Sequence, residues 1–247
     1  MIRFENVVKR FGEKTVLNGI ILSVKEGEIL FILGRSGTGK SVTLKTLVGL
    51  LKPDEGRVTI TDAAHSRVLD VGSLDDEGLA EARKLCGMVF QHPALLDSLT
   101  IHDNVAFGLR GWSGDKKRER VLECLSLVHL DHSILNKMPT EISFGMQKRV
   151  SIARTVAPSP RCLLFDEPTT GLDPITTGAI NGLIQELSRR LKVTSLVVSH
   201  DMGCALSAAD RILILEQGKI LVLGTVPEIR ESREPLIRDF LSEVITQ

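Results

Sequence analysis

Short apolar runs punctuated by glycines occupy the first third of the chain. Runs rich in β-branched and aromatic residues predict strands, and a helical pattern follows the third run and ends before Pro53. The predicted strands are Ile2–Val8, Ile20–Val24, Ile29–Leu33 and Arg57–Thr61, and the predicted helix is Lys40–Leu51. The polar, charge-mixed stretch Asp62–Lys84 predicts a surface excursion that ends in a helix.

Helical patterning dominates the middle of the chain, from Gln91 to Val156. Beyond it, strands and helices alternate again: the expected segments are Cys162–Phe165, Gly178–Leu191, Ser195–Ser199, Ala205–Ala209 and Arg211–Leu215. Alternating strands and helices indicate a mainly parallel sheet with helices on both faces. We therefore expect an α/β core that is interrupted by a helical insert.

Composition narrows the function classes. A chain of 247 residues suits one large domain, and 31 Lys and Arg against 31 Asp and Glu give a net charge of zero, which argues against nucleic-acid binding. The apolar runs are too short to span a bilayer and the start has no apolar signal region, so we expect a soluble, cytoplasmic chain. The four cysteines lie far apart, which favours buried thiols over a zinc site or disulfides.

A phosphate-binding loop follows the third predicted strand. The segment Gly34–Ser41 matches G-x-x-x-x-G-K-[ST] in full and opens a helix, which is the context this motif requires. Small residues let backbone N–H groups surround phosphates, Lys40 neutralises their charge, and the Ser41 hydroxyl is a ligand for Mg²⁺. The motif predicts a nucleoside triphosphate site without specifying the class of enzyme.

Two carboxylates, Asp166 and Glu167, come directly after a predicted strand. Strand ends at the carboxyl edge of a parallel sheet point into the ligand crevice. We expect Asp166 to hold the Mg²⁺ shell and Glu167 to polarise the attacking water as general base. Asp173 follows in Thr170-Gly-Leu-Asp-Pro174, and spacing alone favours a turn that leads to the helix near Gly178.

These motifs, in this order, resemble the ATP-binding subunits of ABC transporters over nearly the whole chain. The resemblance implies a P-loop NTPase core of the α/β class, with an N-terminal antiparallel β part and a helical insert. It implies one ABC ATPase domain, with residues 1–90 and 157–247 as nucleotide-binding core and 91–156 as helical subdomain. It also implies ATP hydrolysis with ATP and Mg²⁺ as the bound groups.

The resemblance assigns roles to further residues. Phe11 matches the aromatic that stacks on adenine, Gln91 the glutamine that reaches the Mg²⁺ and water region, and His200 the histidine that contacts the γ-phosphate. The predicted catalytic residues are Glu167, His200 and Gln91, and the predicted metal ligands are Ser41, Gln91 and Asp166. The predicted ATP-binding residues are Phe11, Gly34, Arg35, Ser36, Gly37, Thr38, Gly39, Lys40, Ser41, Val42, Ser143, Phe144, Gly145 and Asp173.

The family signature is Leu-Ser-Gly-Gly followed by Gln or Met-Gln, and this chain has Ile-Ser-Phe-Gly-Met-Gln at 142–147. In the family this segment closes over the ATP of a second subunit, so the resemblance implies a dimer of two copies. Phe144 replaces the first glycine. If that position requires a positive φ, Phe144 carries strain of about 1–3 kcal/mol.

Two local features resemble the Mla/Mkl group of phospholipid-transport ATPases: Asp-Pro-Ile-Thr at 173–176 and the tail Glu234–Leu241. This resemblance implies a lipid transporter, with integral membrane permease subunits and an Mce-type lipid-binding protein as partners. The chain would then lie on the cytoplasmic side of the inner or plasma membrane, held there through the permease. We do not expect the chain to bind nucleic acids.

Other functions stay open. An importer of amino acids or other small solutes would share every motif, and so would a soluble ABC ATPase of DNA repair, translation or Fe–S assembly. A small-molecule or nucleoside kinase would share the phosphate loop but lack the Ser143 segment and His200. Because Phe144 alters the signature segment, the function of a subunit that binds ATP without hydrolysing it also stays open.

Overall fold

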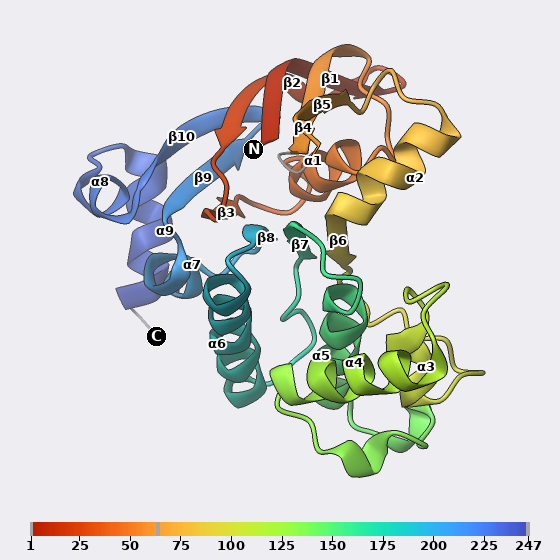
Figure 1. The fold of residues 1–247 in the computed structure, drawn as a ribbon. Helices are drawn as coiled ribbons and strands as arrows, with labels where there is room; N and C mark the ends of the chain where they lie inside the picture. Colours follow the sequence, from red (N-terminus) through yellow and green to blue (C-terminus); the bar gives the residue numbers. More distant parts are fainter. Residues whose placement is uncertain (1, 63–64, 246–247) are drawn as a thin grey trace.

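The computed structural model describes residues 2–62 and 65–245. The described residues leave out 1, 63–64 and 246–247. All five belong to the predicted domain, and 63–64 also belong to the predicted excursion Asp62–Lys84. Figure 1 shows two sheets with helices between and below them. No described helix combines the length and apolarity needed to cross a bilayer.

The central sheet has six strands in the order β10-β9-β3-β8-β7-β6. All neighbours pair in parallel except β9 and β10. The strands are β3 (Ile29–Leu33), β6 (Cys86–Val89), β7 (Cys162–Asp166), β8 (Thr194–Val198), β9 (Arg211–Glu216) and β10 (Lys219–Thr225). This arrangement confirms the predicted α/β class with a mainly parallel sheet.

The central strands bury both faces. In β3, Ile29, Phe31 and Leu33 point into the core under the helices, while Leu30 and Ile32 point into a second core towards the other sheet. Because successive side chains alternate between faces, a strand covered on both sides must be apolar throughout. The same reason explains why every residue of β7 and β8 is buried, with apolar side chains at Cys162–Phe165 and Leu196–Val198.

The second sheet is antiparallel, with the order β2-β1-β4-β5. Its strands are β1 (Ile2–Phe11), β2 (Lys14–Val24), β4 (Glu55–Asp62) and β5 (Arg67–Asp70). It carries the N-terminal antiparallel part that the sequence resemblance implied. Helix α1 (Lys40–Leu47) lies between the two sheets, where Leu44 and Leu47 are fully buried (Figure 1).

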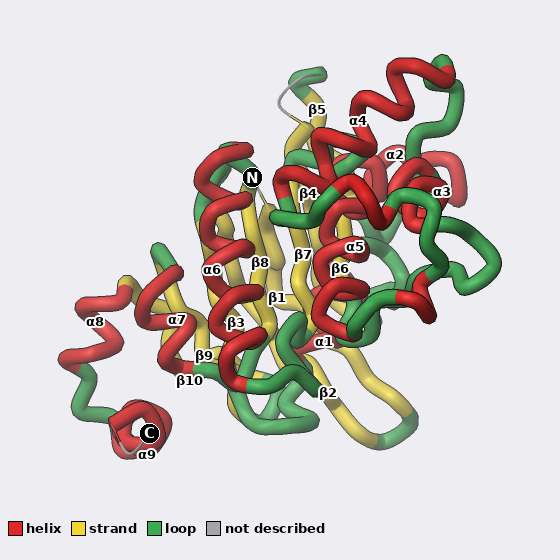
Figure 2. The backbone as a smooth tube through the Cα atoms, turned by 90° about the horizontal axis from the view of Figure 1, so that it is seen from below, coloured by secondary structure: helices red, strands yellow, loops and turns green. Residues whose placement is uncertain are grey.

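The helices below the central sheet are α5 (Phe144–Val156), α6 (Pro174–Leu191) and α7 (Met202–Ala208). Helices α3 (Ile101–Ala106) and α4 (Gly114–Leu127) pack with α5 and project to one side (Figure 2). Two short 3-10 helices, at His132–Ile134 and Pro139–Glu141, connect α4 to α5. Helix α2 (Asp76–Leu85) precedes β6, and α8 (Val226–Glu231) and α9 (Pro235–Ile245) follow β10.

Several predicted boundaries are wrong. Helix α1 ends at Leu47 because Gly49, with φ 66°, turns the chain, rather than continuing to Leu51. The predicted excursion contains the strand β5 before its helix. Helix α6 starts at Pro174, ahead of the predicted Gly178, because the Asp173 side chain accepts hydrogen bonds from the N–H groups of Ile175 and Thr176 and caps it.

Candidate nucleotide site

The loop from Gly34 to Gly39 leaves β3 and enters α1. Gly39 caps α1 with φ 107°, and no side chain bonds to the first N–H groups of this helix. A Cβ at Gly39 would lie 2.8 Å from both the Leu17 Cδ2 and the Val16 carbonyl oxygen, so only glycine fits there. The start of α1 therefore offers backbone N–H groups and the positive end of a helix dipole to an anion.

The side chains of Lys40 and Ser41 turn towards the acidic end of β7. Lys40 is 5% exposed, and its Nζ donates to the carbonyls of Gly34 (2.8 Å) and Arg35 (3.0 Å). The Ser41 Oγ donates to Asp166 Oδ1 at 2.6 Å. The fold thus brings together two motifs that are 125 positions apart along the chain.

Glu167 stands at the centre of this group. Its backbone has a φ of 46°, in the left-handed region, and its N–H donates to the Val198 carbonyl at 3.0 Å. Its carboxylate oxygens lie 3.5 Å from Lys40 Nζ and 3.9 Å from His200 Nδ1, and one accepts from Thr170 Oγ1 at 3.1 Å. Backbone strain of this kind is held by the surrounding contacts and fixes the direction of the carboxylate.

A cavity of about 440 Å³ lies over the loop. Phe11, at the end of β1 and 47% exposed, lines this cavity together with Gln91, Glu167 and the loop residues. The lining residues are Phe11, Val16, Ser36, Gly37, Gly39, Lys40, Ser41, Val42, Gln91 and Glu167. Of these, only Val16 was absent from the sequence prediction, because it belongs to no motif.

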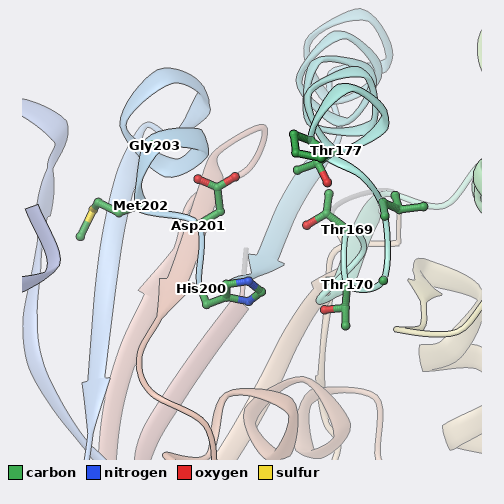
Figure 3. A pocket seen from close by; sticks show the side chains of 10 residues that line it. Thr169, Thr170, Thr177, His200, Asp201, Met202 and Gly203 are labelled. Carbon is green, nitrogen blue, oxygen red and sulfur yellow. The ribbon is translucent and has the colours of Figure 1, made fainter. Parts of the chain in front are cut away.

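A second cavity, of about 480 Å³, is lined by the segment Thr169–Leu172, which follows Glu167, and by His200. Figure 3 shows the His200 ring pointing towards the loop that carries Thr169 and Thr170. The His200 side chain is 67% exposed and lines this second cavity with Asp201 and Thr177. Thr170, which bonds to Glu167, was not predicted as a site residue, since its role depends on a contact rather than on spacing.

The remaining predicted residues do not join the loop cavity. Asp173 caps α6, and hydrogen bonds from Thr176 and Ile175 hold the pKa of its carboxyl below the usual range. Ser143 caps α5, where its Oγ accepts from the Met146 N–H at 3.3 Å. A Cβ on Gly145 would lie 2.9 Å from Thr176 Cγ2, so the start of α5 packs against the start of α6.

Phe144 is the first residue of α5, and its φ is not in the left-handed region. The strain expected for a residue that replaces glycine there is therefore not present. The ring is 37% exposed and faces Gly171, at which an added Cβ would lie 3.7 Å from Phe144 Cε1. With Ile175, which is 87% exposed, it forms an apolar patch at the starts of α5 and α6.

The chemistry of the donor set fits Mg²⁺ as the partner of a nucleotide. Among the described residues, no three His, Cys, Asp or Glu side chains gather as a metal site, so a dedicated protein cage is not formed there. Mg²⁺ takes oxygen ligands, often one or two from the protein, with the rest from phosphates and water. The adjacent Ser41 hydroxyl and Asp166 carboxylate match that pattern.

Comparison with protein families gives one match that covers most of the chain. The family model described as ABC transporter matches residues 17–170. Among curated proteins, the chain is 37% identical to the methionine import ATP-binding protein MetN 2 of Rhodococcus jostii, over 99% of this chain and 72% of the relative. It is 40% identical to the methionine import ATP-binding protein MetN of Clostridium tetani, over 93% of this chain and 70% of the relative.

Solved structures agree with these relatives. A dimeric ATP-binding cassette in a post-hydrolysis state, bound to ADP and Pi, superposes with a TM-score of 0.81 at 36% identity, covering 92% of this chain and 99% of that one. The cbiO1 protein of Clostridium perfringens, part of the ABC transporter complex cbiONQ, gives a TM-score of 0.82 at 28% identity, covering 98% of both chains.

Proposed function

The chain belongs to the ABC transporter family as an ATP-binding, ATP-hydrolysing subunit, and from this premise we propose that it powers the import of a small solute, with methionine as the first candidate. The cavity that combines residues of the Gly34–Ser41 loop with Gln91 and Glu167 supports the ATPase role, and the methionine import proteins among the relatives support the choice of substrate.

ATP binds along the loop cavity. The Phe11 ring stacks on adenine at the cavity edge, and the N–H groups at the start of α1 hold the phosphates. Lys40 now bonds to two loop carbonyls, and it exchanges these bonds for phosphate oxygens when ATP enters. Ser41, Asp166 and Gln91 are the residues that would hold Mg²⁺, which when bound neutralises charge on the β- and γ-phosphates.

Hydrolysis depends on Glu167. Its carboxylate accepts a proton from the attacking water as general base, and His200, 3.9 Å away, contacts the γ-phosphate from the second cavity. The hydrogen bond from Thr170 to Oε2 and the contact of Lys40 with Oε1 fix the direction of the carboxylate.

Each ATP site is completed by a second copy of the chain. The segment Ser143–Gly145 and Asp173 do not line the loop cavity of their own chain, whereas they share the apolar patch of Phe144 and Ile175 on one exposed face. We place them against the ATP of the partner, as the dimeric relative suggests. ATP that touches both faces favours the closed dimer, and loss of the γ-phosphate reopens it.

The transported substrate is where the sequence prediction and the relatives diverge. The segment Asp173–Thr176 and the tail Glu234–Leu241 predicted a phospholipid transporter with an Mce-type partner. The curated relatives are methionine importers, so they favour the alternative of an importer for amino acids or other small solutes and give the lipid prediction and its Mce-type partner no support.

The helical part links ATP to the membrane partner in this proposal. We assign residues 1–90 and 157–247 to the nucleotide-binding core and 91–156 to a helical subdomain that docks on integral membrane permease subunits. The chain then works at the cytoplasmic face of the membrane, attached through the permease.

Uptake of labelled methionine tests the proposal. Cells that lack this chain are complemented with the wild type, with Glu167→Gln, or with Glu186→Gln, a matched control whose exposed carboxylate on α6 pairs with His129. We expect uptake with the wild type and with Glu186→Gln, and none with Glu167→Gln. Methionine uptake that does not depend on the chain contradicts the import proposal, and a defect in phospholipid movement instead restores the lipid prediction.

A further inference from the structure

One buried cation lies between the two segments that the proposed mechanism assigns to different ATP molecules. Lys148, on the first turns of α5, is 0% exposed. Its Nζ donates to the backbone carbonyls of Gln91 and, at 3.4 Å, of Phe90. The residue follows the signature segment by a single helical turn, and it reaches across to the loop that leaves β6.

The same ammonium also faces the signature segment. The Nζ lies 5.8 Å from the centre of the Phe144 ring, within the range of a cation–π contact. Among the described residues, no carboxylate forms an ion pair with Lys148. Its charge is therefore balanced by the two carbonyl dipoles and the ring, so a shift of the Gln91 loop or of Phe144 leaves a buried ammonium without its partners.

Two further residues of α5, Arg154 and Thr155, contact the loop and the strand that precedes it. Arg154 donates from Nη1 to the Ala94 carbonyl at 2.8 Å and from Nη2 to the Pro93 carbonyl at 3.3 Å. Thr155 Oγ1 lies 3.4 Å from the Met88 carbonyl. Helix α5 thus holds the segment from 88 to 94 by its carbonyl groups, and Lys148 holds the part that carries Gln91.

We propose that Lys148 is a positioning residue that joins the Gln91 loop to the signature segment, so that a movement of Gln91 at one ATP moves Ser143–Gly145 at the other. The inference rests on the proposed roles of Gln91 and of the signature segment. Lys148 touches no nucleotide in this account. It acts by making the loop and the start of α5 move as one body.

The test compares Lys148→Met, which keeps the apolar length of the side chain, with Lys148→Gln, which keeps a donor for the carbonyls. Arg149→Met is the matched control, because Arg149 is the next residue on α5 and its guanidinium donates to the Val128 carbonyl (3.0 Å) inside the helical part. The measurements are kcat and KM for ATP hydrolysis, with kcat expressed per subunit that binds a fluorescent ATP analogue.

We expect Lys148→Met to lower kcat about tenfold or more, because losing a hydrogen bond from a charged group has an effect of that size. The KM should change less than about twofold. Lys148→Gln should recover part of the rate, and Arg149→Met should keep it within about twofold. Normalising to subunits that bind the analogue removes misfolded protein from the comparison. If Lys148→Met fails to fold, the kcat of Lys148→Gln is compared with the kcat of Arg149→Met, and a lower value for Lys148→Gln supports the inference.

A kcat for the Lys148 variants equal to that of Arg149→Met overturns the inference. Equal losses in kcat and in analogue affinity also overturn it, because they indicate a general loss of structure. A wild-type chain that hydrolyses no ATP is a different outcome, since it removes the proposed function and leaves nothing for Lys148 to couple.

Discussion

Replacing Phe144 by glycine distinguishes two accounts of the altered signature segment. If the residue occupied a backbone conformation reserved for glycine, Phe144→Gly would release about 1–3 kcal/mol of strain and stabilise the fold. The structure instead places Phe144 in the first turn of α5, with a ring that packs near Gly171 and Lys148. The two accounts therefore predict opposite signs.

The size of the expected loss follows from burial. Phe144 is 37% exposed, so about two thirds of the 1.5–3 kcal/mol that a fully buried Phe contributes, roughly 1–2 kcal/mol, is lost on truncation. Glycine in a helix costs roughly 0.5–1 kcal/mol relative to alanine. Together these terms predict that Phe144→Gly lowers the free energy of unfolding by about 2 kcal/mol.

Urea unfolding of the isolated chain, followed by circular dichroism without nucleotide, measures this difference. Phe144→Leu is the control, because leucine keeps a Cβ and most of the apolar contact and should lose less than about 1.5 kcal/mol. A Phe144→Gly variant as stable as the wild type, or more stable, would show instead that Phe144 carries backbone strain.

Three further predictions concern the core. The four cysteines should resist a thiol reagent such as DTNB at pH 8 in the folded chain and react fully in denaturant, because burial raises the pKa of Cys124 to about 11 and of Cys204 to about 12; rapid labelling of the folded chain contradicts this. Since the folded pKa of Cys124 lies above its ordinary value of 9.0, its contribution to stability is complete below pH 9 and should disappear as the pH rises towards about 11. Asn104→Leu should lower the free energy of unfolding in urea by about 3–5 kcal/mol, because the buried Asn104 amide bonds to backbone groups of Leu96, Leu99 and Thr100; a loss below about 1 kcal/mol contradicts it.

The elements that the sequence predicted well are those with local signals. Strand β3 is apolar at every position and β7 at every position before Asp166, because both of their faces are covered. The first half of β2 escaped prediction because exposed residues such as Lys14 and Asn18 interrupt its apolar positions. The start of α6 escaped because Asp173 and Pro174, typical of turns, here form a helix cap.

The site residues likewise divide into those that a local motif predicted and those that it did not. The loop residues Lys40 and Ser41 and the acidic Asp166 belong to contiguous motifs, so their types and spacing predicted their chemistry, and the fold brings them together. Thr170 and Lys148 carry no such signal. Each matters through a contact across the fold, with Glu167 and with the Gln91 loop, and sequence spacing contains no information on those contacts.

The molar mass of the Glu167→Gln variant in Mg·ATP shows whether Glu167 drives hydrolysis of ATP held between two copies. Light scattering on the eluted protein gives this value directly. The account predicts twice the chain mass of 27.1 kDa for the variant with ATP, because the closed dimer cannot reopen, and 27.1 kDa without nucleotide. A variant that binds ATP and stays at 27.1 kDa would contradict it.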